Sequence, residues 1–320
     1  MEEIKVHPQA AALLEELARG GGAPPIQELT PEQARKTRNP LFIRLGGTGT
    51  RLHRTEDLEI EGPGGPIPLR IYRPGPQEIL PVVVYFHGGG WVICNIDTHD
   101  SLCRFLAHET ETLVISVGYR LAPEHKYPAA LEDAYAAIRW AHESGKRVGA
   151  DPGRIAVAGD SAGGNLAAAV SLMARDRGGP PLLCQVLMYP VLNVSRLDTG
   201  TYQTYADRFI LTASAMDYYR KHYARDEQDF LDPYVSPLLA RDLRGLPPAF
   251  LAAAEHDVLT DEIAAYHERL LEAGVPSAYR CYEGMIHPFF SFLTVFDTAR
   301  HALSDVAAHL KDRFSNAPPV

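Results

Sequence analysis

The chain has 320 residues, of which 46% are hydrophobic and 22% are charged, an ordinary balance for a globular protein with a large core. Its formal net charge is −9, and its basic residues are scattered rather than gathered into a stripe, so we expect no nucleic-acid partner. No run of the sequence approaches the ~18 consecutive apolar residues of a membrane-spanning helix, so no membrane span is expected.

The first residues, MEEIKVHPQAAALLEELARGGG, are acidic and amphipathic. They lack a basic stretch followed by an apolar stretch, the pattern of a secretory signal, so the cytoplasm is the expected location. The cysteines lie far apart without CxxC spacing, which favours buried reduced thiols over a disulfide or a metal site. These residues are Cys94, Cys103, Cys184 and Cys281.

The N-terminal segment is expected to be helical, with leucines at helical spacing in ALLEEL. The stretch TPEQARKT offers a helix start, with Thr30 as the N-cap and Pro31 as the first helical residue. Two strands, 57–62 and 67–74, are predicted next, joined by the turn GPGGP.

From residue 81 onward, apolar strand-like runs alternate with helical patterns. The predicted strands are 81–86, 112–117, 154–158, 184–190, 248–254 and 277–282, and the predicted helices are 97–108, 128–143, 162–174, 261–274 and 292–314. The alternation stops at 193–225, a tyrosine-rich polar stretch that we interpret as an insertion. This order predicts an α/β fold with a mostly parallel central sheet and helices on both faces.

A candidate nucleophile lies at the carboxyl end of a predicted strand, where open parallel sheets carry their sites. Gly159-Asp160-Ser161-Ala162-Gly163 matches G-x-S-x-G between a strand and a helix. A strand-to-helix turn this sharp needs glycines two residues either side of the serine, and it presents the hydroxyl at a helix N-terminus. We therefore interpret Ser161 as a nucleophile rather than turn filler.

A serine nucleophile needs a base and an acid that orients the base. His287 lies just past the strand 277–282, and Asp257 lies just past the strand 248–254. The chain order serine, aspartate, histidine is that of one known class of triads. Of the rival histidines, His267, His301 and His309 are expected at the surface of helices, His142 ends a helix, and His256 is less useful than its neighbour Asp257. Of the rival acids, Glu255 is expected to be a structural hydrogen-bonding acid, and Asp261 and Glu262 are expected to be ordinary acids of the first turn of a helix.

Three glycines follow the strand 81–86 in the stretch His87-Gly88-Gly89-Gly90-Trp91. Backbone N–H groups without neighbouring side chains can approach a substrate carbonyl, as an oxyanion hole requires. We predict that the N–H groups of Gly88, Gly89 and Ala162 surround the developing oxyanion, and that His87 supports the loop by hydrogen bonding.

Four stretches together resemble one family. HGGGW at 87–91, YRLAPEHKYPAALEDA at 119–134, GDSAGGNL at 159–166, and the late EHD and histidine resemble the hormone-sensitive-lipase-like carboxylesterases of bacterial type. The resemblance runs from about residue 59 to the C-terminus. YRLAPEHKYP is interpreted as structural, with prolines that fix a loop and start a helix.

The resemblance implies an α/β-hydrolase core under a mostly helical cap. With the interruptions in composition, it predicts a division into 1–50 (first part of the cap), 51–192 (first part of the core), 193–225 (cap insertion) and 226–320 (second part of the core). It also assigns the nucleophile, acid and base to Ser161, Asp257 and His287.

The sequence departs from the family pattern at two positions. Val258 stands where proline is common after the aspartate, and Pro288 stands where glycine is common after the histidine. Neither change removes a reacting group.

The expected activity is hydrolysis of esters through an acyl-enzyme, without a metal or organic cofactor. The resemblance implies short- to medium-chain acyl esters. An amidase, a deacetylase or an acyltransferase with the same triad remains an alternative, and a non-catalytic small-ligand receptor on this fold is a remote one. The substrate pocket is predicted to include Trp91, Phe209, Leu211 and Phe289, and a homodimer is possible through an exposed sheet edge near SAYRCY.

Overall fold

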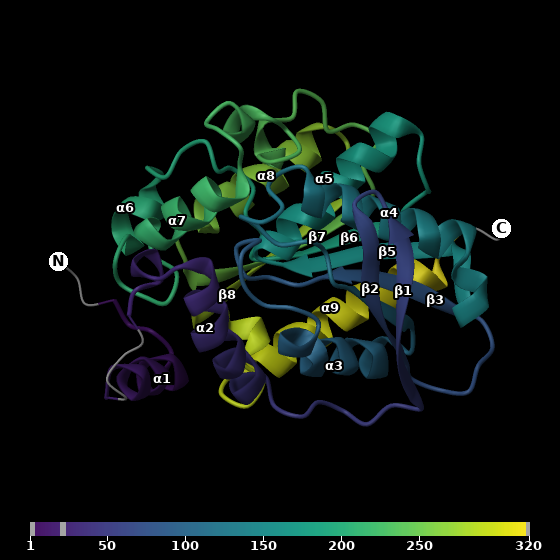
Figure 1. The fold of residues 1–320 in the computed structure, drawn as a ribbon, viewed down its shortest axis with the longest axis horizontal. Helices are drawn as coiled ribbons and strands as arrows, with labels where there is room; N and C mark the ends of the chain where they lie inside the picture. Colours follow the sequence, from purple (N-terminus) through teal and green to yellow (C-terminus); the bar gives the residue numbers. More distant parts are fainter. Residues whose placement is uncertain (1–3, 20–23, 318–320) are drawn as a thin grey trace.

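The computed structural model describes residues 4–19 and 24–317. Within these residues the chain is built around an eight-stranded sheet with the order β1-β2-β4-β3-β5-β6-β7-β8 (Figure 1). The strands are β1 (Arg54–Gly62), β2 (Gly65–Arg73), β3 (Leu80–Phe86), β4 (Leu113–Val117), β5 (Ala150–Asp160), β6 (Cys184–Met188), β7 (Ala249–His256) and β8 (Ser277–Ile286).

The sheet is antiparallel at one edge and parallel elsewhere. β1 pairs with β2, and β2 with β4, in antiparallel register, whereas the pairs from β4 through β3, β5, β6 and β7 to β8 are parallel. Parallel central strands are buried on both faces, and the run Val82–Phe86 is fully buried. The predicted mostly parallel α/β fold is confirmed.

Helices cover both faces of this sheet (Figure 1). On one face α3 packs against α9; on the other α4 and α5 pack against each other and the central strands, and α8 packs against β7 and β8. Their bounds are α3 (Asp100–Thr110), α4 (Ala129–Glu143), α5 (Ala162–Arg177), α8 (Thr260–Glu272) and α9 (Asp297–Ser315).

Four further helices gather at one end of the sheet (Figure 1). They are α1 (Pro8–Arg19), α2 (Pro31–Gly46), α6 (Gly200–Tyr205) and α7 (Ala213–Tyr223). The predicted start of α2 is confirmed, because Thr30 Oγ1 accepts a hydrogen bond from Gln33 N and Gln33 Oε1 accepts one from Thr30 N. Two segments far apart in sequence, 8–46 and 200–223, thus lie together.

Some predicted helix starts are wrong by several residues. The helix predicted from 97 is a short 3-10 turn, Asp97–His99, before α3. Asn95 and Thr98 exchange backbone-to-side-chain hydrogen bonds of 3.0 and 3.1 Å, which compete with helical bonding there. The helix predicted from 292 begins at Asp297, because the preceding phenylalanines are buried in an irregular path.

The remaining 3-10 turns are Ile26–Glu28, Gly145–Val148, Asp229–Leu231, Pro237–Leu239 and Phe289–Ser291.

Cys94, Cys103 and Cys184 are buried free thiols as predicted, but the prediction is wrong for Cys281, whose position on the edge strand β8 leaves it exposed. Among the described residues, no helix is both long enough and apolar enough to cross a lipid bilayer.

An ion pair explains part of the YRLAPEHKYPAALEDA stretch. The Asp133 side chain, 1% exposed, accepts hydrogen bonds from the backbone N and the guanidinium of Arg120 at 2.8–2.9 Å. The pair ties the loop after β4 to α4.

We expect Asp133→Ala to lower the free energy of unfolding by about 3 kcal/mol, because it leaves the Arg120 donors without their acceptor. Glu143→Ala removes an exposed carboxylate from the same helix and is the control, with no expected change. Urea denaturation of both variants measures the difference, and equal stabilities would contradict this assignment.

A buried acid holds the chain after β6. Glu262 Oε1 on α8 accepts hydrogen bonds from Leu192 N at 2.6 Å and Asn193 N at 3.3 Å, while Oε2 has no partner among the described residues. Burial raises the pKa of Glu262 to about 8, although the two backbone donors oppose the shift. The carboxyl group is therefore protonated in the folded chain at neutral pH.

This protonation makes stability depend on pH. Below about pH 4.5 Glu262 is protonated in both the folded and the unfolded chain. As pH rises toward about 8, only the unfolded chain ionises, so the free energy of unfolding falls by about 1.4 kcal/mol per pH unit. Glu262→Gln should lose this contribution to the slope, whereas the exposed Glu268→Gln should keep it; parallel profiles for all three proteins would contradict the prediction.

Candidate active site

Ser161 occupies the sharp turn between β5 and α5. Its backbone has φ 55° and ψ −119°, and its N–H donates to Met188 O at 2.8 Å. A Cβ on Gly159 would overlap the carbonyl oxygen of Gly163, and one on Gly163 would overlap that of Phe86. The glycines predicted from the motif are thus required by close backbone contact.

His287 and Asp257 are joined at the carboxyl ends of β8 and β7. His287 Nδ1 lies 2.7 Å from Asp257 Oδ2, and Leu259 N donates to Asp257 Oδ1 at 3.1 Å. Both side chains are almost fully buried, and the His287 ring lies against the Tyr189 ring with centroids 4.4 Å apart. The contact through Nδ1 leaves Nε2 for another partner.

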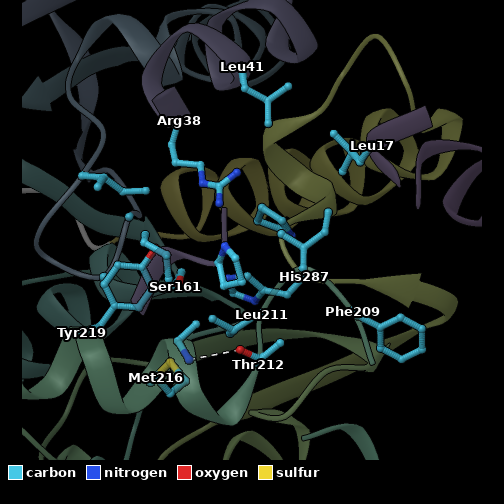
Figure 2. Close-up of a pocket in the computed structure, with 18 of the residues that line it drawn as sticks. Leu17, Arg38, Leu41, Ser161, Phe209, Leu211, Thr212, Met216, Tyr219 and His287 are labelled. Atoms are coloured by element: carbon cyan, nitrogen blue, oxygen red, sulfur yellow. Dashed lines mark hydrogen bonds between the residues drawn. The ribbon is translucent and has the colours of Figure 1, made fainter. Parts of the chain in front are cut away.

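Ser161 and His287 line the same cavity (Figure 2). Within residues 4–19 and 24–317, Asp257 is bonded to His287, whereas Ser161 Oγ makes no hydrogen bond to the imidazole. Hydrogen bonds of this kind tighten when substrate binds. The structure therefore brings the three predicted residues to one site. The contact between Asp257 and His287 is formed, and the hydrogen bond between His287 and Ser161 is not.

The glycine loop after β3 corrects one predicted donor. Gly88 N donates to Asp160 Oδ1 at 2.8 Å, so that N–H is already used inside the protein. Gly89 and Gly90 both line the cavity, with φ 111° and φ 58°. Gly90, for which the sequence predicted no role, thus lines the cavity, whereas Gly88 does not.

The N–H groups of Gly89, Gly90 and Ala162 have no acceptor among the described residues. Ala162 is the first residue of α5, where a backbone N–H has no partner within the helix. Gly89 and Gly90 line the cavity together with Ser161, and Ala162 follows Ser161 directly in the chain, so these three unpaired donors belong to residues in or next to the cavity wall.

Asp160 is the most extensively bonded group of the site. Besides Gly88 N, its carboxylate accepts a hydrogen bond from Tyr85 Oη at 2.6 Å and lies 3.3 Å from His99 Nε2. Burial alone would raise the pKa of Asp160, but interactions with His99 and Tyr85 outweigh it and hold the pKa below its usual range. Asp160 is therefore a buried carboxylate anion.

His87 contacts the glycine loop that it was predicted to support. Its Nδ1 lies 2.7 Å from Gly88 O, and Tyr119 Oη donates to His87 O at 2.7 Å. Burial and the nearby His99 lower the pKa of His87 to about 3, so the imidazole is neutral.

Arg35 of α2 holds the same loop from the outside, a contact that no motif indicated. Its Nε donates to Val92 O at 2.7 Å, its Nη2 donates to Ala122 O at 2.8 Å, and it pairs with Glu124 at 2.6 Å. The N-terminal helix and the loop are thus directly bonded.

The cavity has a volume of about 830 Å³, within the usual range for small-molecule sites. Of the predicted pocket residues, Phe209 and Leu211 line it. Trp91 is fully buried and stacks on Tyr223, with ring centroids 4.3 Å apart, and Phe289 packs on Tyr189 in the core. The structure therefore places Trp91 and Phe289 in packing positions rather than on the cavity wall.

The two departures from the family pattern are accommodated. Val258 is fully buried after β7, and Pro288 lines the cavity beside His287.

Among the described residues, no cluster of three or more His, Cys, Asp or Glu side chains is arranged to hold a metal ion.

A family model described as an alpha/beta hydrolase fold matches residues 83–291. The chain is 46% identical to the esterase LipI of Mycobacterium tuberculosis over 78% of this chain and 79% of LipI. It is 44% identical to the carboxylesterase NlhH of the same organism over 77% of this chain and 78% of NlhH.

Solved structures agree with these relatives. The hyperthermophilic esterase of Pyrobaculum calidifontis has a TM-score of 0.91 at 41% identity, covering 97% of this chain and 99% of that one. The catalytic fold, the serine turn and the relatives lead to one conclusion. The chain belongs to the hormone-sensitive-lipase-like, bacterial-type carboxylesterase family of the α/β-hydrolase fold, and it is a carboxylic ester hydrolase.

Proposed function

We propose that this carboxylesterase hydrolyses short- to medium-chain acyl esters through a Ser161-His287-Asp257 triad and an acyl-enzyme. The observation that carries the proposal is that a serine on a strained turn, the Asp257-bonded His287 and the unpaired N–H groups of Gly89 and Gly90 meet at one cavity, with the unpaired N–H of Ala162 next to the serine. Each group has the chemical type that acyl transfer requires.

In the first half of the reaction, His287 Nε2 takes the proton of Ser161 as Oγ attacks the ester carbonyl carbon. The carbonyl oxygen gains negative charge and is stabilised by the N–H groups of Gly89, Gly90 and Ala162. The C–O bond to the alcohol then breaks, and the alcohol leaves with the proton from His287. Asp257 orients the imidazole and stabilises its protonated form.

In the second half, water replaces the alcohol. His287 takes a proton from water as its oxygen attacks the acyl carbon, and the bond to Ser161 Oγ breaks with return of the proton to the serine. The products are the free acid and the original enzyme.

The cavity wall supports the proposed acyl range and the proposed cap. Most of its apolar residues come from the N-terminal segment and from 207–219, the two segments assigned to the cap. These residues, with others of the wall, are Leu14, Leu17, Leu41, Phe42, Phe209, Ile210, Leu211, Met216 and Phe292. A cytoplasmic location and a homodimer through the β8 edge stay predictions.

The first test compares p-nitrophenyl esters from acetate to palmitate as substrates of the intact chain and of Ser161→Ala. We expect turnover with a maximum at short or medium acyl length, and a loss of about 10⁶-fold in kcat in the variant. Mass spectrometry of quenched reactions should show an acyl adduct only with Ser161 present.

Ser304→Ala, an exposed serine on α9, is the matched control and should keep full activity. Turnover that survives Ser161→Ala would contradict the proposed nucleophile. Turnover of p-nitroanilides in preference to all esters would favour an amidase instead.

A second test addresses the oxyanion donors. Gly90 has φ 58°, and a Cβ there would overlap the Tyr219 ring, so Gly90→Ala should displace its N–H. Loss of one such donor lowers kcat by about 10²-fold or more.

Gly178→Ala is the control for backbone strain, because Gly178 has φ 62° with open space around it. It should lower stability slightly and leave kcat unchanged. A kcat for Gly90→Ala equal to that of Gly178→Ala would contradict the role of Gly90.

A further inference from the structure

One side chain of the cavity wall has a charge that ester hydrolysis does not use. Arg38 projects from α2 into the cavity that Ser161 and His287 line (Figure 2). It is half-buried, and most of the wall around it is apolar. A cation in such surroundings is unfavourable unless an anion or several acceptors compensate for its lost hydration.

The protein itself supplies little compensation. Arg38 Nη2 donates to Pro24 O at 2.6 Å, and no carboxylate pairs with Arg38 within residues 4–19 and 24–317. A guanidinium has five N–H donors in a planar fork, which matches the two oxygens of a carboxylate. Most of this donor capacity therefore remains for a ligand.

Two other acids of the cavity wall are bonded elsewhere, and the third is exposed. Glu16 pairs with Arg44 at 3.3 Å, and Asp160 is bonded to Gly88 of the glycine loop and to His99. Asp207 precedes Arg208 in the chain and is exposed in the segment before α7. None of these acids neutralises the Arg38 guanidinium.

We propose that Arg38 is a specificity-determining residue that selects esters carrying a carboxylate, on either the acyl or the alcohol part, over neutral esters of the same shape. The inference rests on the proposed function for the position of the scissile bond. It adds a substrate class, monoanionic esters, to the hydrolysis of simple acyl esters.

Two substrate pairs differ in charge but little in shape. On the acyl side the pair is p-nitrophenyl hydrogen glutarate and p-nitrophenyl pentanoate, and on the alcohol side it is p-acetoxybenzoate and its methyl ester. Arg38→Gln removes the charge and keeps an N–H for Pro24 O, while Arg38→Lys keeps the charge without the fork. Lys36→Gln removes an exposed charge from the same helix outside the cavity and is the control.

We expect Arg38→Gln to lower kcat/KM for the anionic member of at least one pair by about tenfold or more, which equals about 1.4 kcal/mol. The neutral members should change by less than about twofold, because they make no charge-assisted hydrogen bond. Arg38→Lys should restore part of the difference, and Lys36→Gln should leave both ratios unchanged. An equal loss on anionic and neutral substrates in both pairs would overturn the proposal, since it would show a structural role.

Binding without turnover separates this inference from the proposed function. Calorimetry should show tighter binding of monomethyl glutarate by Ser161→Ala than by Ser161→Ala/Arg38→Gln, and no such difference for methyl pentanoate. Failure of ester turnover together with this binding difference would refute the proposed function and retain the role of Arg38. Normal turnover of neutral esters without any difference in binding or in kcat/KM ratios would refute the role of Arg38 alone.

Discussion

The carboxylate of Asp160 connects the two halves of the site. It lies at the end of β5, directly before Ser161, and its hydrogen bond to Gly88 N reaches the loop that leaves the adjacent strand β3. A buried anion without hydrogen bonds would be strongly unfavourable, so Tyr85, Gly88 and His99 must keep their positions around it. The solvation of one buried charge therefore ties the glycine loop after β3 to the strand end that carries Ser161.

The strained turn depends on the same strands. Ser161 has a positive φ, a conformation that costs of order 1–3 kcal/mol and persists only where its surroundings hold it. Here Met188 O on β6 accepts the Ser161 N–H, and the backbone of α5 approaches Phe86 O at Gly163 closely enough to exclude any side chain. The proposed reacting groups thus stand at the ends of strands of the sheet, whereas much of the cavity wall is formed by helices outside it.

The sequence places the three proposed triad residues near one another because each stands just past a strand with its own signal. G-x-S-x-G requires a turn at Ser161, and the ends of β7 and β8 lie side by side in a parallel sheet, where His287 meets Asp257. It does not predict which of three consecutive glycines faces the cavity. That choice is made by the bond between Gly88 and Asp160, which joins residues 72 positions apart.

Packing of large side chains is equally invisible to local patterns. Trp91 next to the glycine loop suggests a pocket residue, yet it stacks on Tyr223 from a helix far along the chain. Arg35 and Arg38 belong to one predicted helix and carry the same charge, but only the three-dimensional structure assigns one to the loop and the other to the cavity. Residue type and helical spacing cannot separate them, because both positions lie on the inward side of α2.

The bonds of Arg35 have a consequence for the exchange of parts between relatives. The N-terminal helices form much of the cavity wall, so their replacement by the corresponding segment of another family member would transfer substrate preference without altering the catalytic sheet. Such a chimera inherits one condition, however. The grafted α2 must bring an arginine at the position of Arg35, because Val92 O and Ala122 O, and with them the glycine loop after β3, are held by that side chain. Recombination at this boundary is therefore constrained by the bonds of Arg35 in addition to the other contacts of α2 with the core.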